Sequence, residues 1–212
     1  MPICSRCAGI YIGIFLSAAL ILLFERKIRT RFSGRKITAI TVILFVVMAA
    51  ESGLSSLKII PSHNTARFLT GYAVGWFLPL LILPLLNSVV FRPAICLQEQ
   101  YLKKAGHFII WIFSGPAMGF IFLVTYKQMI LFWSIASVAG LVLFIAALIL
   151  ILAFAVNLKL KNTVQNPAIF WCFFLAAIAI SLAFISLSSY LKSIINPYMS
   201  ISYEYLKSIF SR

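Results

Sequence analysis

Residues 2–24 read PICSRCAGIYIGIFLSAALILLF, and this stretch decides the fold of the chain. Two cysteines, Cys4 and Cys7, stand three residues apart with Arg6 between them, and an apolar run over residues 8–24 follows at once. A run of this length and composition predicts a membrane-spanning helix. Because it lacks a basic segment in front and a small-residue cleavage site, we expect a retained helix and not a secretory signal.

The composition extends this prediction to the whole chain. Of the 212 residues, 63% are hydrophobic and only 10% are charged, and the mean hydropathy is +1.06. A soluble domain is about 45–50% apolar and about 25% charged. The sequence therefore predicts an all-α, polytopic integral membrane protein with no soluble domain, whose main partner is the lipid bilayer.

Six spans are expected, at about residues 8–24, 37–50, 64–86, 107–126, 131–156 and 168–189. The second is short for a bilayer, so flanking residues should continue its helix. Pro79 and Pro84 each remove a backbone donor from the third span, which favours a kink there. We expect three regions: residues 1–90 with the cysteine motif and three spans, residues 91–189 with three further spans, and an interfacial amphipathic tail at residues 190–212.

The basic residues predict the orientation. The 18 Lys and Arg against 4 acidic residues give a net charge of +14, but they flank apolar segments, so we expect no nucleic-acid partner. Six of them lie in residues 25–36, and so dense a cluster belongs on the cytoplasmic side. The N-terminus and its cysteines are then outside, in a multi-pass protein of the bacterial inner membrane.

The two cysteines are the strongest chemical signal. Their spacing suits either a small disulfide ring or two ligands of one metal ion such as zinc or another transition metal, and His63 is the obvious further ligand on that side. We expect the metal or disulfide to fix the first helix against the third. Cys96 and Cys172 fall on the cytoplasmic side and are expected to be buried or reduced thiols.

Other functions stay open, and the sequence does not decide whether the protein is an enzyme. The pair could instead cycle between dithiol and disulfide against a membrane quinone. A small-molecule transporter is a further alternative, favoured by the prolines in the third span and by Pro116 in the fourth. Against transport, the middle of every span lacks an ionisable residue.

Four polar residues are expected to support the cysteine site. Arg6, Glu51 and Arg67 fall on the external side, and Tyr11 follows Cys7 by one helical turn. Glu51 could pair with Arg67, and Arg6 could compete for the same carboxylate. The structural alternative is an arginine reaching lipid phosphate and a glutamate in water.

Small residues four apart recur in three of the spans. The pairs are Gly9 with Gly13, Gly71 with Gly75, and Gly115 with Gly119. Such pairs let helix backbones approach closely in lipid. We expect them to pack helices within the chain, with a homo-oligomer through these faces as the alternative.

Two blocks of the chain resemble a known family. PICSRCAGIYIG at residues 2–13 is similar to the P-x-C-x-R-C-x-G-I-Y-x-G signature of the domain of unknown function 2085 family of predicted bacterial membrane proteins. NTARFLTGYAVG at residues 64–75 resembles that family's second block, N-x-x-R-x-x-T-G-x-x-x-G. The resemblance covers about the first 90 residues and implies a helical membrane protein without an established activity. It also implies a Cys-His segment ahead of the first block, which would complete a metal site of three Cys and one His; this chain starts at the block, so either that segment is absent or Met1 is an internal methionine of a longer reading frame.

Overall fold

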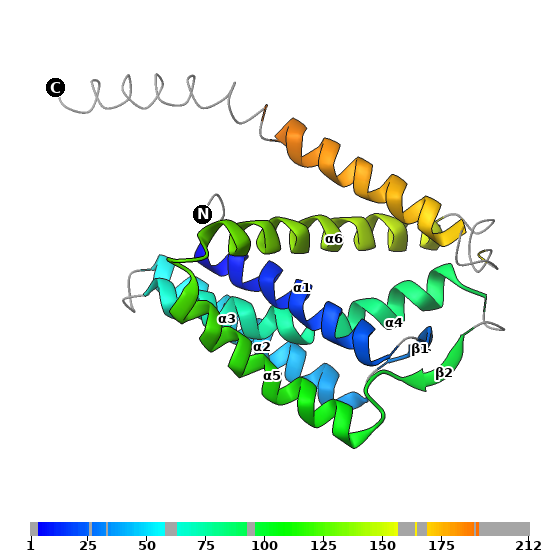
Figure 1. Cartoon of the computed structure of the whole chain (residues 1–212), viewed down its shortest axis with the longest axis horizontal. Helices are drawn as coiled ribbons and strands as arrows, with labels where there is room; N and C mark the ends of the chain where they lie inside the picture. The colour runs from blue at the N-terminus through cyan, green and yellow to red at the C-terminus, as the bar shows by residue number, and fades with distance from the viewer. Residues whose placement is uncertain are drawn as a thin grey trace.

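The computed structural model describes residues 4–25, 27–32, 34–57, 63–92, 96–156, 164, 169–188 and 190, and it is built almost entirely from helices (Figure 1). Its elements are α1 (Ser5–Phe24), β1 (Arg29–Arg31), α2 (Arg35–Ser56), α3 (Asn64–Phe77), α4 (Pro79–Val90), β2 (Leu97–Gln100), α5 (Ala105–Thr125), α6 (Ile130–Val156) and a last helix, Ile169–Ser188.

Six helical segments of the described chain are long and apolar enough to cross a membrane, which confirms the predicted architecture. The second extends to Arg35–Ser56, so the flanking residues do continue its helix. The third is Asn64–Val90, made of α3 and α4 in succession. The predicted interfacial tail at residues 190–212 lies outside the described residues, apart from Tyr190.

The third span is interrupted at the predicted place. α3 ends at Phe77 and α4 begins at Pro79, with Pro84 inside it. Each proline removes one helical hydrogen bond, which weakens the continuity of the helix. Next to the break, the buried Ser17 hydroxyl donates to the carbonyl of Trp76 (2.6 Å) and accepts from Trp111 Nε1 (3.1 Å). These two hydrogen bonds link the break to α1 and α5.

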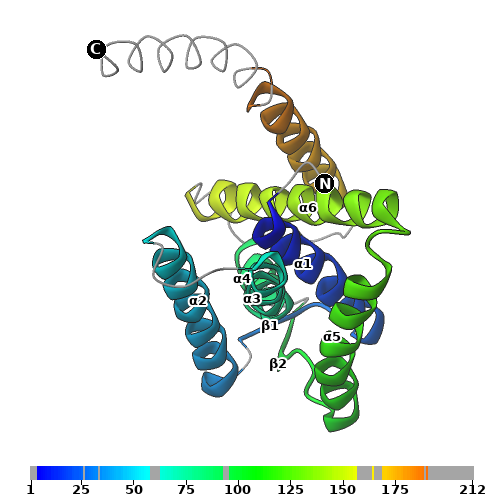
Figure 2. The same ribbon diagram turned by 90° about the vertical axis from the view of Figure 1, so that its left-hand side faces the viewer.

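α1 is the central helix of the molecule. It packs most extensively against α3, and it also contacts α4, α5 and α6 (Figure 2). Its inner face buries Ile12, Ser17 and Ile21 completely. The first span of the sequence is therefore the one that other spans surround.

The α1–α3 contact is made by the two glycine pairs. A Cβ atom added to Gly13 would lie 2.8 Å from the carbonyl oxygen of Tyr72, and one added to Gly9, Gly71 or Gly75 would meet backbone of the facing helix at less than 3.0 Å. Real Cβ atoms do not approach backbone so closely, so only glycine permits this packing. These faces therefore pack helices within the chain, as the sequence predicts.

A further glycine, Gly140, extends the same principle to α6. Its Cβ would collide with the backbone carbonyl of Tyr11, so α6 crosses α1 in close backbone contact. Gly115 and Gly119 of α5 instead accommodate aromatic rings, those of Trp76 and Tyr72. The search for glycine pairs did not single out Gly140, because its small partner four residues earlier is Ala136 and not a second glycine.

Stacked aromatic rings fill the space between α3, α5 and α6. The ring centroids of Phe68 and Phe122 are 4.0 Å apart, those of Trp76 and Trp111 5.6 Å, and Trp133 meets Phe122 edge-on. Aromatic pairs in such arrangements stabilise by about 0.5–1.5 kcal/mol beyond their buried area.

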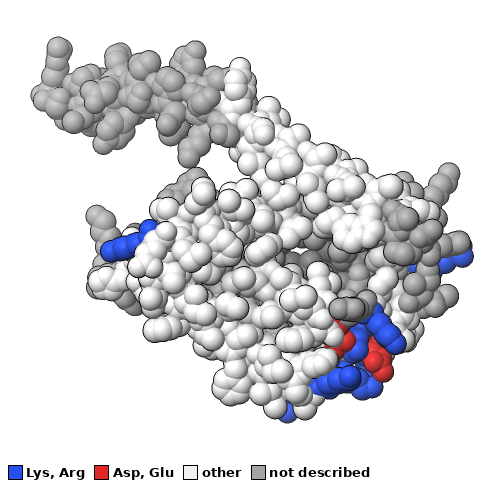
Figure 3. Space-filling model, viewed as in Figure 1, with Lys and Arg blue, Asp and Glu red and all other residues white. Residues whose placement is uncertain are grey.

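Most other apolar surface faces outward, as it does in a protein surrounded by lipid. α2 buries only Thr41, and the helix Ile169–Ser188 is also largely exposed. On the face in Figure 3, Lys and Arg gather mainly at the lower right, a smaller basic patch lies at the left, and a broad uncharged surface separates them. This distribution matches a membrane-spanning band between two polar ends.

Two short strands were not predicted. β1 and β2 pair in parallel, and the amide of Leu97 donates to the carbonyl of Ile28 (3.0 Å). They connect the loop after α1 with the loop before α5. Strands of three and four residues leave too little pattern in a sequence to be predicted.

Candidate functional site

The two cysteines of the motif occupy the first turn of α1. Cys4 is the residue before the helix, and its sulfur accepts a hydrogen bond from the backbone amide of Cys7 (3.3 Å). Cys4 is exposed and Cys7 is partly buried, and both are free thiols. A sulfur thus takes the capping position that Ser, Thr, Asp or Asn usually fills.

This position favours the ionised form of Cys4. Burial raises the pKa of its thiol, but hydrogen bonding to Cys7 and the positive charge of Arg6 more than offset the burial, so the pKa lies below the ordinary value. Helix N-termini and neighbouring cations lower thiol pKa values in the same way. Cys4 is therefore the more nucleophilic candidate of the pair.

Arg6, between the cysteines, joins α1 to α2. Its guanidinium forms an ion pair with Glu51 and donates to the Ser52 hydroxyl (2.9 Å). Thr70 of α3 also reaches Glu51, with its hydroxyl 3.5 Å from the carboxylate. Of the pairings that the sequence left open for Glu51, the one with Arg6 is present.

Arg67 and His63 lie at the start of α3. Arg67 donates to the Ser55 hydroxyl of α2 (2.9 Å). His63 is exposed and precedes α3 without a side-chain capping bond. Among the described residues no group of three or more His, Cys, Asp or Glu could hold a metal ion, so His63 does not join Cys4 and Cys7 as a third ligand.

One expectation about the pair needs correction. Cys4 and Cys7 both belong to the first turn of α1, so a disulfide between them would close a ring within one helix end. It would not connect α1 to α3. The glycine contacts hold those two helices together instead.

A pocket of about 360 Å³ lies beside this turn. From α1 it is lined by Ser5 and Ala8, which directly follow Cys4 and Cys7 in the sequence. The rest of the lining is mostly apolar or aromatic and consists of Asn64, Thr65, Phe68, Phe122, Leu123, Tyr126 and Ile130. The α1, α3 and α5 ends therefore enclose a space large enough for part of an aromatic molecule.

Comparison with known proteins agrees with the motif. Residues 1–81 match the model of the DUF2085 family, described as a predicted membrane protein. Residues 1–81, called the DUF2085 region below, are therefore similar to this family. An uncharacterized protein of Methanocaldococcus jannaschii, MJ1492, is 29% identical over 92 residues, which cover 43% of this chain and 57% of the relative. The chain thus matches just over half the length of that relative, and no solved structure matches it.

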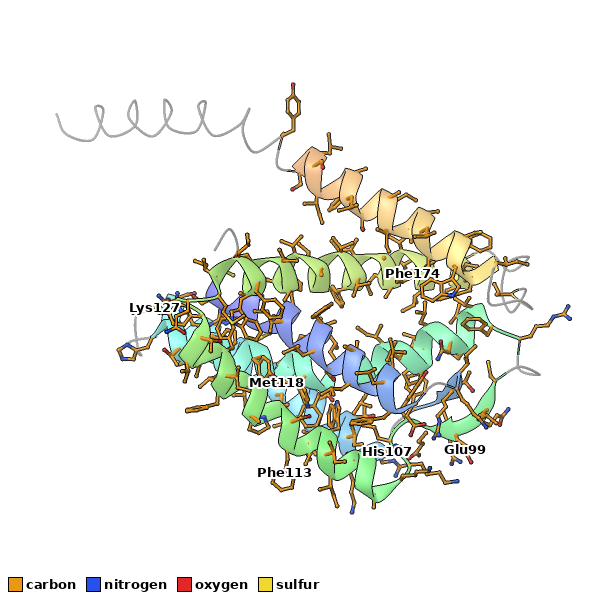
Figure 4. All side chains as sticks on the ribbon, viewed as in Figure 1. Glu99, His107, Phe113, Met118, Lys127 and Phe174 are labelled. Carbon is orange, nitrogen blue, oxygen red and sulfur yellow. The ribbon has the colours of Figure 1, made fainter. Side chains whose placement is uncertain are left out.

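A second polar cluster lies at the opposite end of α1, and sequence reasoning missed it. Glu25, directly after α1, is 5% exposed and pairs with Arg29 of β1, which is 8% exposed and donates to the carbonyl of Gln100 (2.6 Å). His107 of α5 places Nδ1 3.6 Å from Glu25 Oε1, and Glu99 lies on the same side (Figure 4).

Asn87 completes this second cluster from α4. Its buried amide donates to the backbone carbonyl of Arg29 (2.9 Å) and to the Tyr101 hydroxyl (2.7 Å). The cluster therefore joins the DUF2085 region to the part of the chain beyond it. Its one signal in the sequence is the i, i+4 spacing of Glu25 and Arg29, which a loop crowded with basic residues obscures.

Proposed function

We propose that this protein is a membrane thiol–disulfide oxidoreductase whose Cys4–Cys7 pair cycles between dithiol and disulfide at the non-cytoplasmic surface. The observation that carries the proposal is the position of Cys4, an exposed thiol at the N-terminus of α1 that accepts a bond from the Cys7 amide. A thiolate is the attacking species in thiol–disulfide exchange, and this position favours it.

The proposed reaction is balanced by a quinone. Oxidation of the two thiols forms one S–S bond and releases two electrons and two protons, and a lipid-soluble quinone takes both to become a quinol. The pocket beside the pair supports this acceptor because its lining is mostly apolar, with Phe68, Leu123 and Ile130 among its residues. The quinol then joins the membrane pool, and a substrate dithiol reduces the Cys4–Cys7 disulfide by thiol–disulfide exchange and becomes a disulfide itself, which completes the cycle.

The residues around the pair have supporting roles in this proposal. Arg6 supplies the positive charge that favours the Cys4 thiolate, and Glu51 holds the guanidinium in place. Arg67 and Thr70 help to hold α2 against the same end of the molecule. Tyr11 stands one turn below Cys7 on α1.

Metal binding is the second candidate. Two free thiols three residues apart on one helical turn have the spacing of two ligands of a tetrahedral zinc site. Further ligands would come from outside the described residues. Metal analysis of the purified protein separates the two candidates, because one bound ion for each chain would favour the metal site and its loss on chelation would release both thiols.

The wider setting of the protein is proposed on the same grounds. We place it in the cytoplasmic membrane with its cysteines outside, and we treat residues 1–90 as the functional unit, residues 91–189 as its helical support and residues 190–212 as an interfacial tail. Transport is less well supported, because the ionisable residues of the described spans lie near their ends.

The test uses variants in which Cys96 and Cys172 are serine, so that only the motif reacts. Purified reduced protein in lipid is mixed with a short-chain quinone, and free thiols and quinol are measured together. We expect two thiols to disappear for each quinol that forms. Cys7→Ser should abolish quinol formation and should trap mixed disulfides between Cys4 and small thiols.

The control is the parent protein with Cys172 restored, which should give the same stoichiometry because that thiol lies far along the chain in the last helix. Two thiols that stay reduced in the presence of quinone, and a Cys7→Ser variant that forms no adducts, would refute the proposal.

A further inference from the structure

We infer that the second polar cluster, at the cytoplasmic end of α1, forms a binding site for a phosphate group, supplied by the headgroup of an anionic phospholipid. The site is a pocket of about 400 Å³ between the end of α1, the two strands and the start of α5. Its lining combines apolar residues with three cationic ones: Leu23, Phe24, Glu25, Lys27, Arg29, Leu97, Glu99, Lys104 and His107.

The charges of the lining leave cations unpaired. Glu25 is neutralised by Arg29, and Glu99 is bound by Lys103, whose hydrogen bond and charge hold the pKa of that carboxyl below its usual value. Among the residues that the structure describes, Lys27 and Lys104 form no ion pair. Two positive side chains therefore remain on the rim of the pocket for an incoming anion.

The start of α5 adds backbone donors to the same place. The first amides of α5, like those of any helix, lack an intrahelical partner. Lys104, the residue before the helix, gives them no side-chain cap. A Cβ atom built on Gly106 meets nothing within 4 Å, so the backbone there is open to approach. Uncapped helix N-termini bind anions, and phosphates in particular.

Buried polar atoms without partners show that the cluster is not complete by itself. Glu25 and Arg29 are more than nine-tenths buried, yet Glu25 Oε1, Arg29 Nε and His107 Nδ1 have no hydrogen-bond partner. Leaving such atoms unsatisfied is costly. The Arg29 Nε–H group and a ring N–H group of His107 are donors that a phosphate oxygen can satisfy, whereas Glu25 Oε1 is an acceptor and gains no bond from a phosphodiester.

The apolar part of the lining favours a lipid as the source of the phosphate. Leu23 is 70% exposed and Leu97 is 39% exposed, and both border the pocket where α1 leaves its span. A phospholipid can lay an acyl chain along Leu23 while its phosphate occupies the basic rim. A soluble phosphate compound would leave this apolar surface uncovered.

The experiment compares two variants that remove the same charge. Lys27→Gln with Lys104→Gln removes both rim cations, whereas Arg31→Gln with Lys36→Gln removes two exposed cations on the same face that do not line the pocket. Each protein is placed in nanodiscs of phosphatidylcholine with a minor fraction of spin-labelled phosphatidylglycerol, and bound label is measured. We expect the rim variant to lose about tenfold in lipid affinity and the matched variant less than about threefold.

A second arm adds millimolar inorganic phosphate to nanodiscs with and without phosphatidylglycerol and follows the His107 ring by NMR. Weak binding that competes with phosphatidylglycerol, and that the rim variant lacks, supports recognition of the headgroup phosphate. Tight binding of inorganic phosphate with no effect of phosphatidylglycerol would overturn the lipid assignment. Equal losses in the two double variants would overturn the site, because they would reflect only general attraction between charges and the membrane.

Discussion

At the scale of single residues, the most informative side chain is Cys4. Its thiol has a pKa below the ordinary value because hydrogen bonds from Cys7 and the charge of Arg6 outweigh burial. A group whose pKa falls on folding stabilises the folded protein at high pH and loses that contribution as the pH drops through the folded value. The Cys4 thiolate therefore contributes above the normal thiol range and not in acid.

This difference predicts a pH profile for alkylation. The rate of carbamidomethylation at Cys4, followed by peptide mass mapping, should rise at a lower pH than that of a cysteine in a model peptide. Arg6→Gln should shift the midpoint upward because it removes the cation, and Arg6→Lys should shift it less because the charge stays. A midpoint that is the same in both variants as in the original protein would show that Arg6 does not act on the thiolate.

A second prediction concerns Glu51, the carboxylate that Arg6 binds. Glu51→Gln removes a partly buried ion pair and weakens the bond to Thr70, so we expect a loss of about 1.5–3 kcal/mol in the free energy of unfolding in detergent. Lys103→Gln is the control: it breaks an exposed pair with Glu99, which should cost far less because water already screens the two charges. Similar losses in both variants would contradict a special role for Glu51.

At this scale the sequence predicted residue types better than their partners. Arg6 and Arg67 were both candidates for Glu51, because both fall on the same side and either side chain is long enough. The structure pairs Arg6 with it, since the first turn of α1 faces the last turns of α2. Which side chains reach Glu51 depends on where three separate helices end, and no spacing within one helix encodes that.

At the scale of secondary-structure elements, the glycine pairs of α1 and α3 are the critical contact. Gly75→Ala would place a methyl group against the backbone of Ile10, which cannot move aside as a flexible side chain would. We expect a destabilisation of about 1–3 kcal/mol, from the separation of the two helices. SDS-induced unfolding followed by circular dichroism measures it.

Gly53→Ala in α2 is the matched control. Nothing lies within 4 Å of a Cβ at that position, so the change should stabilise the helix slightly, by up to about 1 kcal/mol. If Gly53→Ala and Gly75→Ala destabilised equally, loss of backbone freedom and not close packing would explain both.

Helix positions followed from hydropathy because lipid imposes a minimum length and excludes unpaired backbone groups. The kink at Pro79 also followed from the sequence, since proline acts locally. The strands β1 and β2 did not, because they form only when the loops after α1 and before α5 meet. That meeting depends on the packing of α1, α4 and α5, which is a property of the whole bundle.

At the scale of the whole molecule, the second polar cluster connects elements that are far apart in the chain. Glu25→Gln would leave Arg29 buried with less compensation, and we expect a loss of about 3–5 kcal/mol. Adding Arg29→Met should recover part of this loss because no buried charge then remains uncompensated. A double-mutant cycle of unfolding free energies measures the coupling, and additive losses would mean that the two side chains do not act as a pair.

The sidedness of the molecule decides what the cysteine pair can do. The dense basic loop predicts that Lys36 faces the cytoplasm and Cys4 the other side, where disulfides persist. In intact cells a membrane-impermeant maleimide should label Cys4 and a Lys127→Cys variant, and it should label a Lys36→Cys variant only after permeabilisation. Labelling of the Lys36→Cys variant in intact cells would show that the orientation of the molecule in the membrane is the opposite one. The pair would then face a reducing compartment, where two free thiols on one helical turn favour metal binding over a stable disulfide.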